Sequence, residues 1–125
     1  MSGALIPSGR TAQRLGIALT FAAILLSLST RGRLMLHTMG PLHAWYHLAL
    51  FAILGLLAMR SSTKLWVRFA WVAAAILLGL GIEYMEAVRY HIQIEIYDVR
   101  TDTSGVALGG FIGWLFSRRR DTPIN

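Results

Sequence analysis

The stretch LHAWYHLALFAILGLLAMRSSTKLWVRFAWVAAAILLGLGI, residues 42–82, decides the fold. It consists of two apolar runs, residues 42–59 and 65–82, joined by the polar turn 60–64. Each run approaches the roughly 20 apolar residues that a helix needs to cross a hydrocarbon core of about 30 Å. Because the turn is short, the stretch predicts an antiparallel helical hairpin inside a membrane.

The composition of the whole chain is also typical of a membrane protein. Of its 125 residues, 55% are hydrophobic and 14% are charged, whereas a soluble domain carries about 25% charged residues. The formal net charge of +6 comes from short basic clusters between apolar runs, which is typical of membrane-protein loops rather than of a nucleic-acid-binding surface. The chain has no cysteine, which excludes disulfides, thiolate metal sites and cysteine nucleophiles.

Two further apolar runs flank the hairpin. The first, residues 15–28, has features of a signal peptide, and we interpret it as a retained signal anchor. The last, residues 105–116, is short and is extended by residues 101–104. We therefore predict an all-α bundle of four transmembrane helices. The predicted segments are an N-terminal lead (1–14), a membrane domain (15–117) with spans near 15–30, 41–59, 65–84 and 101–117, and a basic tail (118–125).

The basic residues predict how this bundle is oriented. Four spans place both termini on one side of the membrane. The basic residues on that side are Arg10, Arg14, Arg60, Lys64, Arg68, Arg118, Arg119 and Arg120. Those on the other side are Arg31, Arg33, Arg89 and Arg100. Because the more basic side stays in the cytoplasm, both termini are predicted to be cytoplasmic, with N-in/C-in topology. The histidines and most acidic residues then lie near the outer face.

Candidate functional residues occur at the predicted outer ends of the hairpin helices. His43 and His47, spaced i, i+4, open the second run, and Glu83 and Glu86, spaced i, i+3, end the third. Since these runs are neighbours, the two pairs could meet. Such a group can bind a divalent metal, relay protons or orient a polar headgroup. It can equally be interfacial residues that hold helix ends together. We favour a polar network that closes the outer mouth, and we expect no bound metal.

A second acidic pair precedes the last run. Asp98 and Asp102 are spaced i, i+4, and either one could cap the last helix, because carboxylates accept hydrogen bonds from free amides at a helix N-terminus. We favour this structural role over catalysis. Arg89 and Arg100 are natural counter-ions for the acidic residues. Small residues spaced four apart then predict close packing of the last helix against another. These residues are Gly105, Gly109 and Gly113.

The order of these motifs resembles that of the VanZ-like family of small membrane proteins, over residues 41–114. The matching positions are His47, Phe51, Leu54, Glu83, Asp98, Gly105 and Gly109. Three positions depart from the family pattern: His43 stands where an acid is frequent, Glu86 replaces a glutamine, and Asp102 replaces an asparagine. The arginine that commonly precedes the aspartate is not in its usual place.

The resemblance implies a four-helix, multi-pass protein of the bacterial cytoplasmic (inner) membrane with a polar cluster on one side. The family's founding member is associated with low-level resistance to teicoplanin-type glycopeptide antibiotics. We therefore expect the outward-facing cluster to bind a lipid headgroup or a cell-envelope intermediate, with no catalytic residues and no cofactor.

Two alternatives to this interpretation stay open. One is a non-catalytic accessory subunit of a larger membrane complex, and the less favoured one is a metal-dependent enzyme acting on a lipid-linked substrate. The expected partners are membrane lipids, and other membrane subunits or further copies of the chain, rather than nucleic acid.

Overall fold

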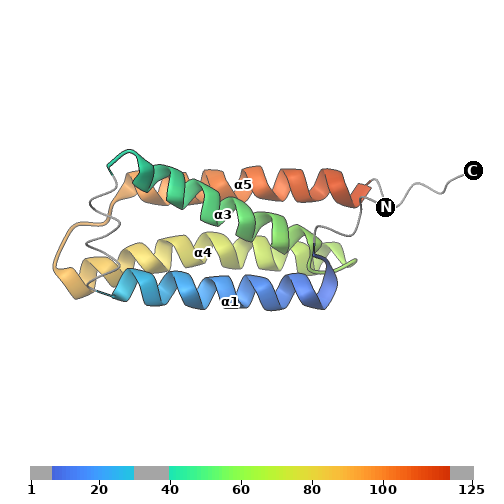
Figure 1. The fold of residues 1–125 in the computed structure, drawn as a ribbon, viewed down its shortest axis with the longest axis horizontal. Helices are drawn as coiled ribbons and strands as arrows, with labels where there is room; N and C mark the ends of the chain where they lie inside the picture. The colour runs from blue at the N-terminus through green and yellow to red at the C-terminus, as the bar shows by residue number, and fades with distance from the viewer. Residues whose placement is uncertain (1–6, 30–39, 119–125) are drawn as a thin grey trace, which may run out of the picture.

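A computed structural model describes residues 7–29 and 40–118, and within these residues the chain forms four helices (Figure 1). The helices are α1 (Gly9–Leu28), α3 (Leu42–Arg60), α4 (Leu65–Tyr90) and α5 (Ile96–Arg118). They lie lengthwise beside one another, and successive helices of the α3–α4–α5 series run in opposite directions. The all-α prediction is confirmed.

Three of these helices, α1, α3 and α4, are long and apolar enough to cross a membrane. The protein is therefore a multi-pass membrane protein. Large hydrophobic side chains such as Phe21 and Leu77 are exposed on the helix surfaces, as lipid-facing positions require. The fourth helix, α5, does not belong to this group: its first turns carry Asp98, Arg100 and Asp102, so it is less apolar.

The helices extend beyond the predicted spans. Helix α1 begins at Gly9 rather than near residue 15, α4 continues to Tyr90 rather than 84, and α5 begins at Ile96 rather than 101. The polar connection between α4 and α5 is consequently short. It opens at His91, whose φ of 53° is left-handed and ends α4. Part of the lead (1–6), the residues 30–39 with Arg31 and Arg33, and the tail from residue 119 lie outside the described residues.

Helices α3 and α5 run parallel and touch through their backbones. A Cβ atom added at Gly109 would lie 1.7 Å from the carbonyl oxygen of Ala52, and one added at Gly105 would lie 2.7 Å from that of Leu48. From the α3 side, a Cβ at Gly55 would lie 2.3 Å from the oxygen of Val106. Only glycine permits this approach, which is the usual role of small residues between membrane helices.

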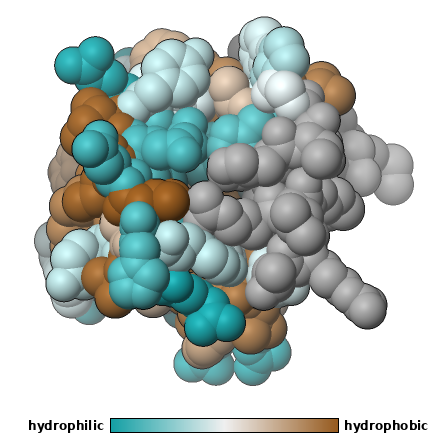
Figure 2. Space-filling model, turned by 90° about the vertical axis from the view of Figure 1, so that its left-hand side faces the viewer, coloured by the Kyte–Doolittle hydropathy of each residue, from teal (hydrophilic) through white to brown (hydrophobic). Residues whose placement is uncertain are grey.

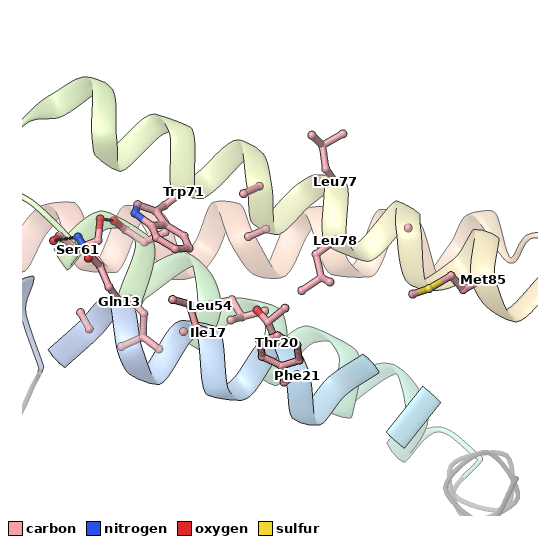
Figure 3. A pocket seen from close by; sticks show the side chains of 17 residues that line it. Gln13, Ile17, Thr20, Phe21, Leu54, Ser61, Trp71, Leu77, Leu78 and Met85 are labelled. Atoms are coloured by element: carbon pink, nitrogen blue, oxygen red, sulfur yellow. Dashed lines mark hydrogen bonds between the residues drawn. The ribbon is translucent and has the colours of Figure 1, made fainter. Parts of the chain in front are cut away.

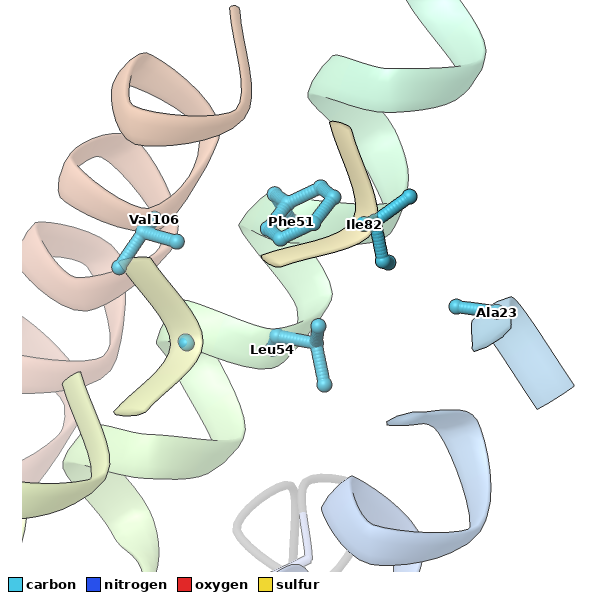
Figure 4. Packing of buried hydrophobic residues seen from close by; sticks show 6 residues of the cluster. Ala23, Phe51, Leu54, Ile82 and Val106 are labelled. Atoms are coloured by element: carbon cyan, nitrogen blue, oxygen red, sulfur yellow. The ribbon is translucent and has the colours of Figure 1, made fainter. Parts of the chain in front are cut away.

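The apolar core lies where the helices converge. Phe51 and Leu54 of α3 pack with Ile82 of α4, Val106 of α5 and Ala23 of α1 (Figure 4). Phe51 and Val106 are almost completely inaccessible, at 1% and 0% exposure. The core therefore joins all four described helices and lies beside the contact between α3 and α5.

The two ends of the bundle differ in character. At the end where α1 begins, Gln13 donates from Nε2 to the Ser61 carbonyl at 3.0 Å, and Arg60 donates from Nε to the Pro7 carbonyl at 2.9 Å. These bonds tie the start of α1 to the turn between α3 and α4. The first turns of α3 and α5 meet the end of α4 at the opposite end, and the predicted site residues lie there (Figure 1).

Candidate functional site

Two histidines of α3 pair with two aspartates of α5 at this opposite end. His43 Nε2 lies 3.0 Å from Asp98 Oδ2, and His47 Nδ1 lies 2.7 Å from Asp102 Oδ1. His47 Nε2 is also 3.8 Å from Asp98 Oδ2. Because the helices run parallel, the equal i, i+4 spacing of both pairs keeps them in register. We refer to these four residues as the His/Asp cluster.

The His/Asp cluster is largely removed from solvent. His47, Asp98 and Asp102 are 7%, 4% and 1% exposed, whereas the His43 side chain keeps 22% of its surface. The ring of Phe51 is stacked with that of His47, with centroids 6.5 Å apart and an interplanar angle of 8°. Buried carboxylates are costly unless they are paired. The histidines supply the partners that the buried carboxylates in the first turns of α5 need.

A glycine of α4 makes room for the deepest carboxylate. A Cβ atom added at Gly79 would lie 2.8 Å from Oδ2 of Asp102. That oxygen is buried and has no hydrogen-bond partner among the described residues, whereas Oδ1 is bonded to His47. One carboxylate oxygen of Asp102, Oδ1, therefore contacts His47, and the other, Oδ2, is covered by α4.

Glu83 lies at the same end but has a different partner. It is 5% exposed, and its Oε2 accepts a hydrogen bond from the Glu95 backbone N–H at 3.3 Å. Its carboxylate thus holds the connection between α4 and α5. Glu86, one turn further along α4, is half-buried. The carboxylates that His43 and His47 contact in the hydrogen bonds described above come from α5.

The physical reason lies in the glycines of α5. They allow α5 to approach α3 more closely than α4 does, although α4 is the next helix in the chain. The signal that could have revealed the pairing is the equal spacing of His43 and His47 with Asp98 and Asp102 on helices that must run parallel.

The expected caps and counter-ions are also placed differently. Asp98 lies in the first turn of α5, but its carboxylate contacts the histidines, and Asp102 is interior to the helix. The Arg89 guanidinium lies 5.8 Å from the ring centroid of Tyr90. Arg100 is exposed on α5. Within residues 40–118, the ion pairs formed by Asp98 and Asp102 are with histidines.

A groove of about 830 Å³ borders the cluster between the first turns of α3 and α5. We call it the α3–α5 groove. His43 and Asp98 line it, together with the cation of Arg100 and apolar or aromatic side chains. The other lining residues are Gly40, Pro41, Ala44, Trp45, Leu48, Glu95, Tyr97, Thr101 and Ser104. Figure 2 looks onto this end of the bundle and shows hydrophilic side chains between hydrophobic ones. The groove therefore joins a charged site to an apolar surface.

A second hollow, of about 610 Å³, lies between α1, α3 and α4. Phe21 of α1, Leu54 of α3 and Leu78 of α4 form part of its wall, and Gln13 and Ser61 lie at one end (Figure 3). Its lining is almost entirely apolar, so it offers space for hydrocarbon rather than for a polar group. The His/Asp cluster does not contribute to it.

Comparisons with known protein families, with curated proteins and with solved structures find no match to this chain. The chemistry of the site therefore has to be derived from its geometry. A membrane protein that buries His47, Asp98 and Asp102 beside an amphiphilic groove can hold a polar or charged ligand there.

Proposed function

We propose that this protein binds the phosphate-bearing headgroup of a membrane lipid or of a lipid-linked cell-envelope intermediate in the α3–α5 groove. The observation that carries the proposal is the composition of this groove. It places the Arg100 guanidinium and the Ser104 hydroxyl on α5 beside the apolar side chains of Trp45 and Leu48 on α3, and the carboxylates of Glu95 and Asp98 complete its polar lining. Guanidinium and hydroxyl donors suit phosphate oxygens, and the apolar side suits an acyl or prenyl chain.

The orientation we propose puts this groove at the outer face of the membrane. Among the described residues, the end opposite to the groove carries Arg10, Arg14, Arg60, Lys64, Arg68 and Arg118, and the groove end carries Arg89 and Arg100. The more basic end faces the cytoplasm in most membrane proteins. On this proposal α5 crosses the membrane as a fourth span, because it runs the length of α3, and both termini are cytoplasmic.

The resemblance to the VanZ-like family supports a role in the bacterial cell envelope. The matched His47 and Asp98 are cluster residues, and the matched Gly105 and Gly109 are the glycines that let α5 touch α3. A protein that holds an envelope lipid at the outer face would influence tolerance to glycopeptide antibiotics, which act on that surface. The alternative, an accessory subunit of a membrane complex, is an outcome of the final test in the Discussion.

Thermal unfolding of the purified protein in mild detergent and EDTA tests the headgroup proposal. Short-chain phosphatidic acid should raise the melting temperature, since a ligand that binds only the folded state stabilises it. Diacylglycerol with the same chains, which lacks the phosphate, should not. A rise in melting temperature with inorganic phosphate alone would indicate a site for the free anion. A rise with phosphatidic acid but not with inorganic phosphate would indicate a site for the lipid.

Two arginine variants complete this experiment. Arg100→Gln should abolish the shift caused by phosphatidic acid, because it removes the cation that lines the groove. Arg89→Gln is the matched control: Arg89 is exposed at the same end of the bundle but is not part of the groove, so its variant should keep the shift. Equal shifts in both variants, or in response to both lipids, would contradict the proposal.

A further inference from the structure

We propose that His43, His47 and Asp98 form a binding site for a divalent transition metal ion, with zinc as the ion that two imidazoles and one carboxylate suit. This inference deepens the proposed function. Only the claim that the metal serves the headgroup rests on the proposed function. The sequence led us to expect no metal, because spacing alone does not place a carboxylate beside both histidines. The structure supplies that carboxylate from α5.

The three side chains converge closely enough to share one ion. One ligand atom from each lies within 4.8 Å of the others. Asp98 Oδ2 is 3.0 Å from Nε2 of His43 and 3.8 Å from Nε2 of His47. Ligands about 2.0–2.2 Å from a tetrahedral zinc ion are roughly 3.3–3.5 Å apart, so small side-chain adjustments would seat the ion.

Asp102 supports the site by orienting one ligand. An ionised carboxylate can only accept hydrogen bonds, so when Asp102 is ionised its bond through Oδ1 to His47 places the proton of a neutral imidazole on Nδ1. The lone pair of His47 is then on Nε2, the nitrogen that faces Asp98. A carboxylate that bonds the far nitrogen of a metal-binding histidine is the usual outer support of zinc sites.

Buried carboxyl groups gather around the three proposed ligands. Asp102 is 1% exposed, and its Oδ2 is buried without a hydrogen-bond partner among the described residues. Together with Asp98 and the nearby Glu83, it gives this end of the bundle three buried carboxylates. A divalent cation held by His43, His47 and Asp98 would offset negative charge on these carboxyl groups.

The position of the site explains what the metal would do. His43 and Asp98 line the α3–α5 groove, so an ion held by three protein ligands would have its fourth position towards that groove. Zinc sites with three protein ligands typically keep one position for water or substrate. A phosphate oxygen of a headgroup is a suitable occupant, and Arg100 lines the same groove.

Metal retention by the full-length protein tests this inference. The protein is purified in mild detergent, treated with EDTA, desalted, incubated with Zn²⁺ and desalted again, and zinc is measured by mass spectrometry. We expect one zinc ion per chain in the wild type, and loss of this zinc in His47→Gln and in Asp98→Asn. Asp102→Asn should retain zinc with roughly 10- to 100-fold lower affinity in a chelator competition. His91→Asn alters an exposed histidine and should leave zinc binding unchanged.

Thermal unfolding in EDTA and size-exclusion chromatography establish that each variant is folded. Folded wild-type protein that retains no zinc overturns the inference, and so does unchanged zinc retention in His47→Gln and Asp98→Asn. Zinc binding is measured without added lipid, and the phosphatidic acid shift is measured in EDTA. Failure of the metal site and failure of the headgroup proposal are therefore distinguishable.

Discussion

Nδ1 of His47 lies 2.7 Å from Oδ1 of Asp102, and both side chains are buried where α3 meets α5. This pair joins helices that are separated in the chain by the whole of α4. It also connects the packing of the bundle with its candidate site, because His47 is at once a partner of a buried carboxylate and a neighbour of Asp98. The stability of the fold and the chemistry of the site therefore depend on the same residues.

Replacement of His47 by alanine should destabilise the protein by about 3–5 kcal/mol, because it leaves the buried Asp102 carboxylate without this partner. Denaturant titration in detergent micelles measures the free energy of unfolding. The double variant His47→Phe/Asp102→Leu should recover part of the loss, since it removes both polar groups. His91→Asn should change the free energy by less than about 0.5 kcal/mol. Equal effects of His47→Ala and His91→Asn would show that the pair is not a stabilising contact.

Gly109→Ala should force α3 and α5 apart, because the new Cβ would lie 1.7 Å from the Ala52 carbonyl oxygen. We expect a loss of about 3 kcal/mol in the free energy of unfolding, or no folded protein in the membrane fraction. Gly81→Ala is the matched control: nothing lies within 4 Å of its added Cβ. That variant should be neutral or more stable by up to about 1 kcal/mol. A well-folded Gly109→Ala protein of wild-type stability would refute the close contact.

Gly79→Ala should disturb the site more than the fold. Its Cβ would lie 2.8 Å from Asp102 Oδ2 and 3.0 Å from Asp102 Cβ, so Asp102 has to move relative to His47. We expect lower zinc affinity, by a factor comparable with that of Asp102→Asn, in a protein that still elutes as a folded species. Chelator competition measures the affinity, and the Gly81→Ala protein serves again for comparison. Unchanged zinc affinity in Gly79→Ala would indicate that Asp102 does not orient a metal ligand.

The absence of cysteine from the chain offers a direct test of the proposed orientation. Single cysteines at Thr63, in the turn between α3 and α4, and at Gln93, between α4 and α5, report on opposite ends of the bundle. A membrane-impermeant maleimide added to intact cells should label Gln93→Cys and not Thr63→Cys. Permeabilised cells should show both labelled. The reverse pattern in intact cells would place the His/Asp cluster at the cytoplasmic face.

The sequence predicted the helices well because each hydrophobic run must satisfy its backbone hydrogen bonds inside a membrane, and a helix does so locally. It also placed all the cluster residues at one end of the bundle, because they lie at the ends of the apolar runs. It did not predict the partners of the histidines. That choice depends on how closely two non-adjacent helices approach, and therefore on Gly105 and Gly109 meeting the carbonyls of Leu48 and Ala52.

The helix ends were also poorly marked in the sequence. Helix α4 ends at His91 in a left-handed conformation, a position where glycine or asparagine is the usual signal. Helix α5 begins in a charged segment that reads as a loop, because Asp98 and Asp102 are compensated by histidines more than fifty positions earlier in the chain. Tertiary pairing, rather than local propensity, makes these turns helical.

The central claim is that the groove beside the His/Asp cluster holds a phosphate-bearing lipid. Native mass spectrometry of the protein extracted from its membrane in mild detergent tests it most directly. We predict a stoichiometric phosphorus-containing lipid on the wild type and on Arg89→Gln, and its loss from folded Arg100→Gln. The same lipid adducts on all three proteins, or a stoichiometric protein partner in place of a lipid, would contradict the account and favour an accessory subunit.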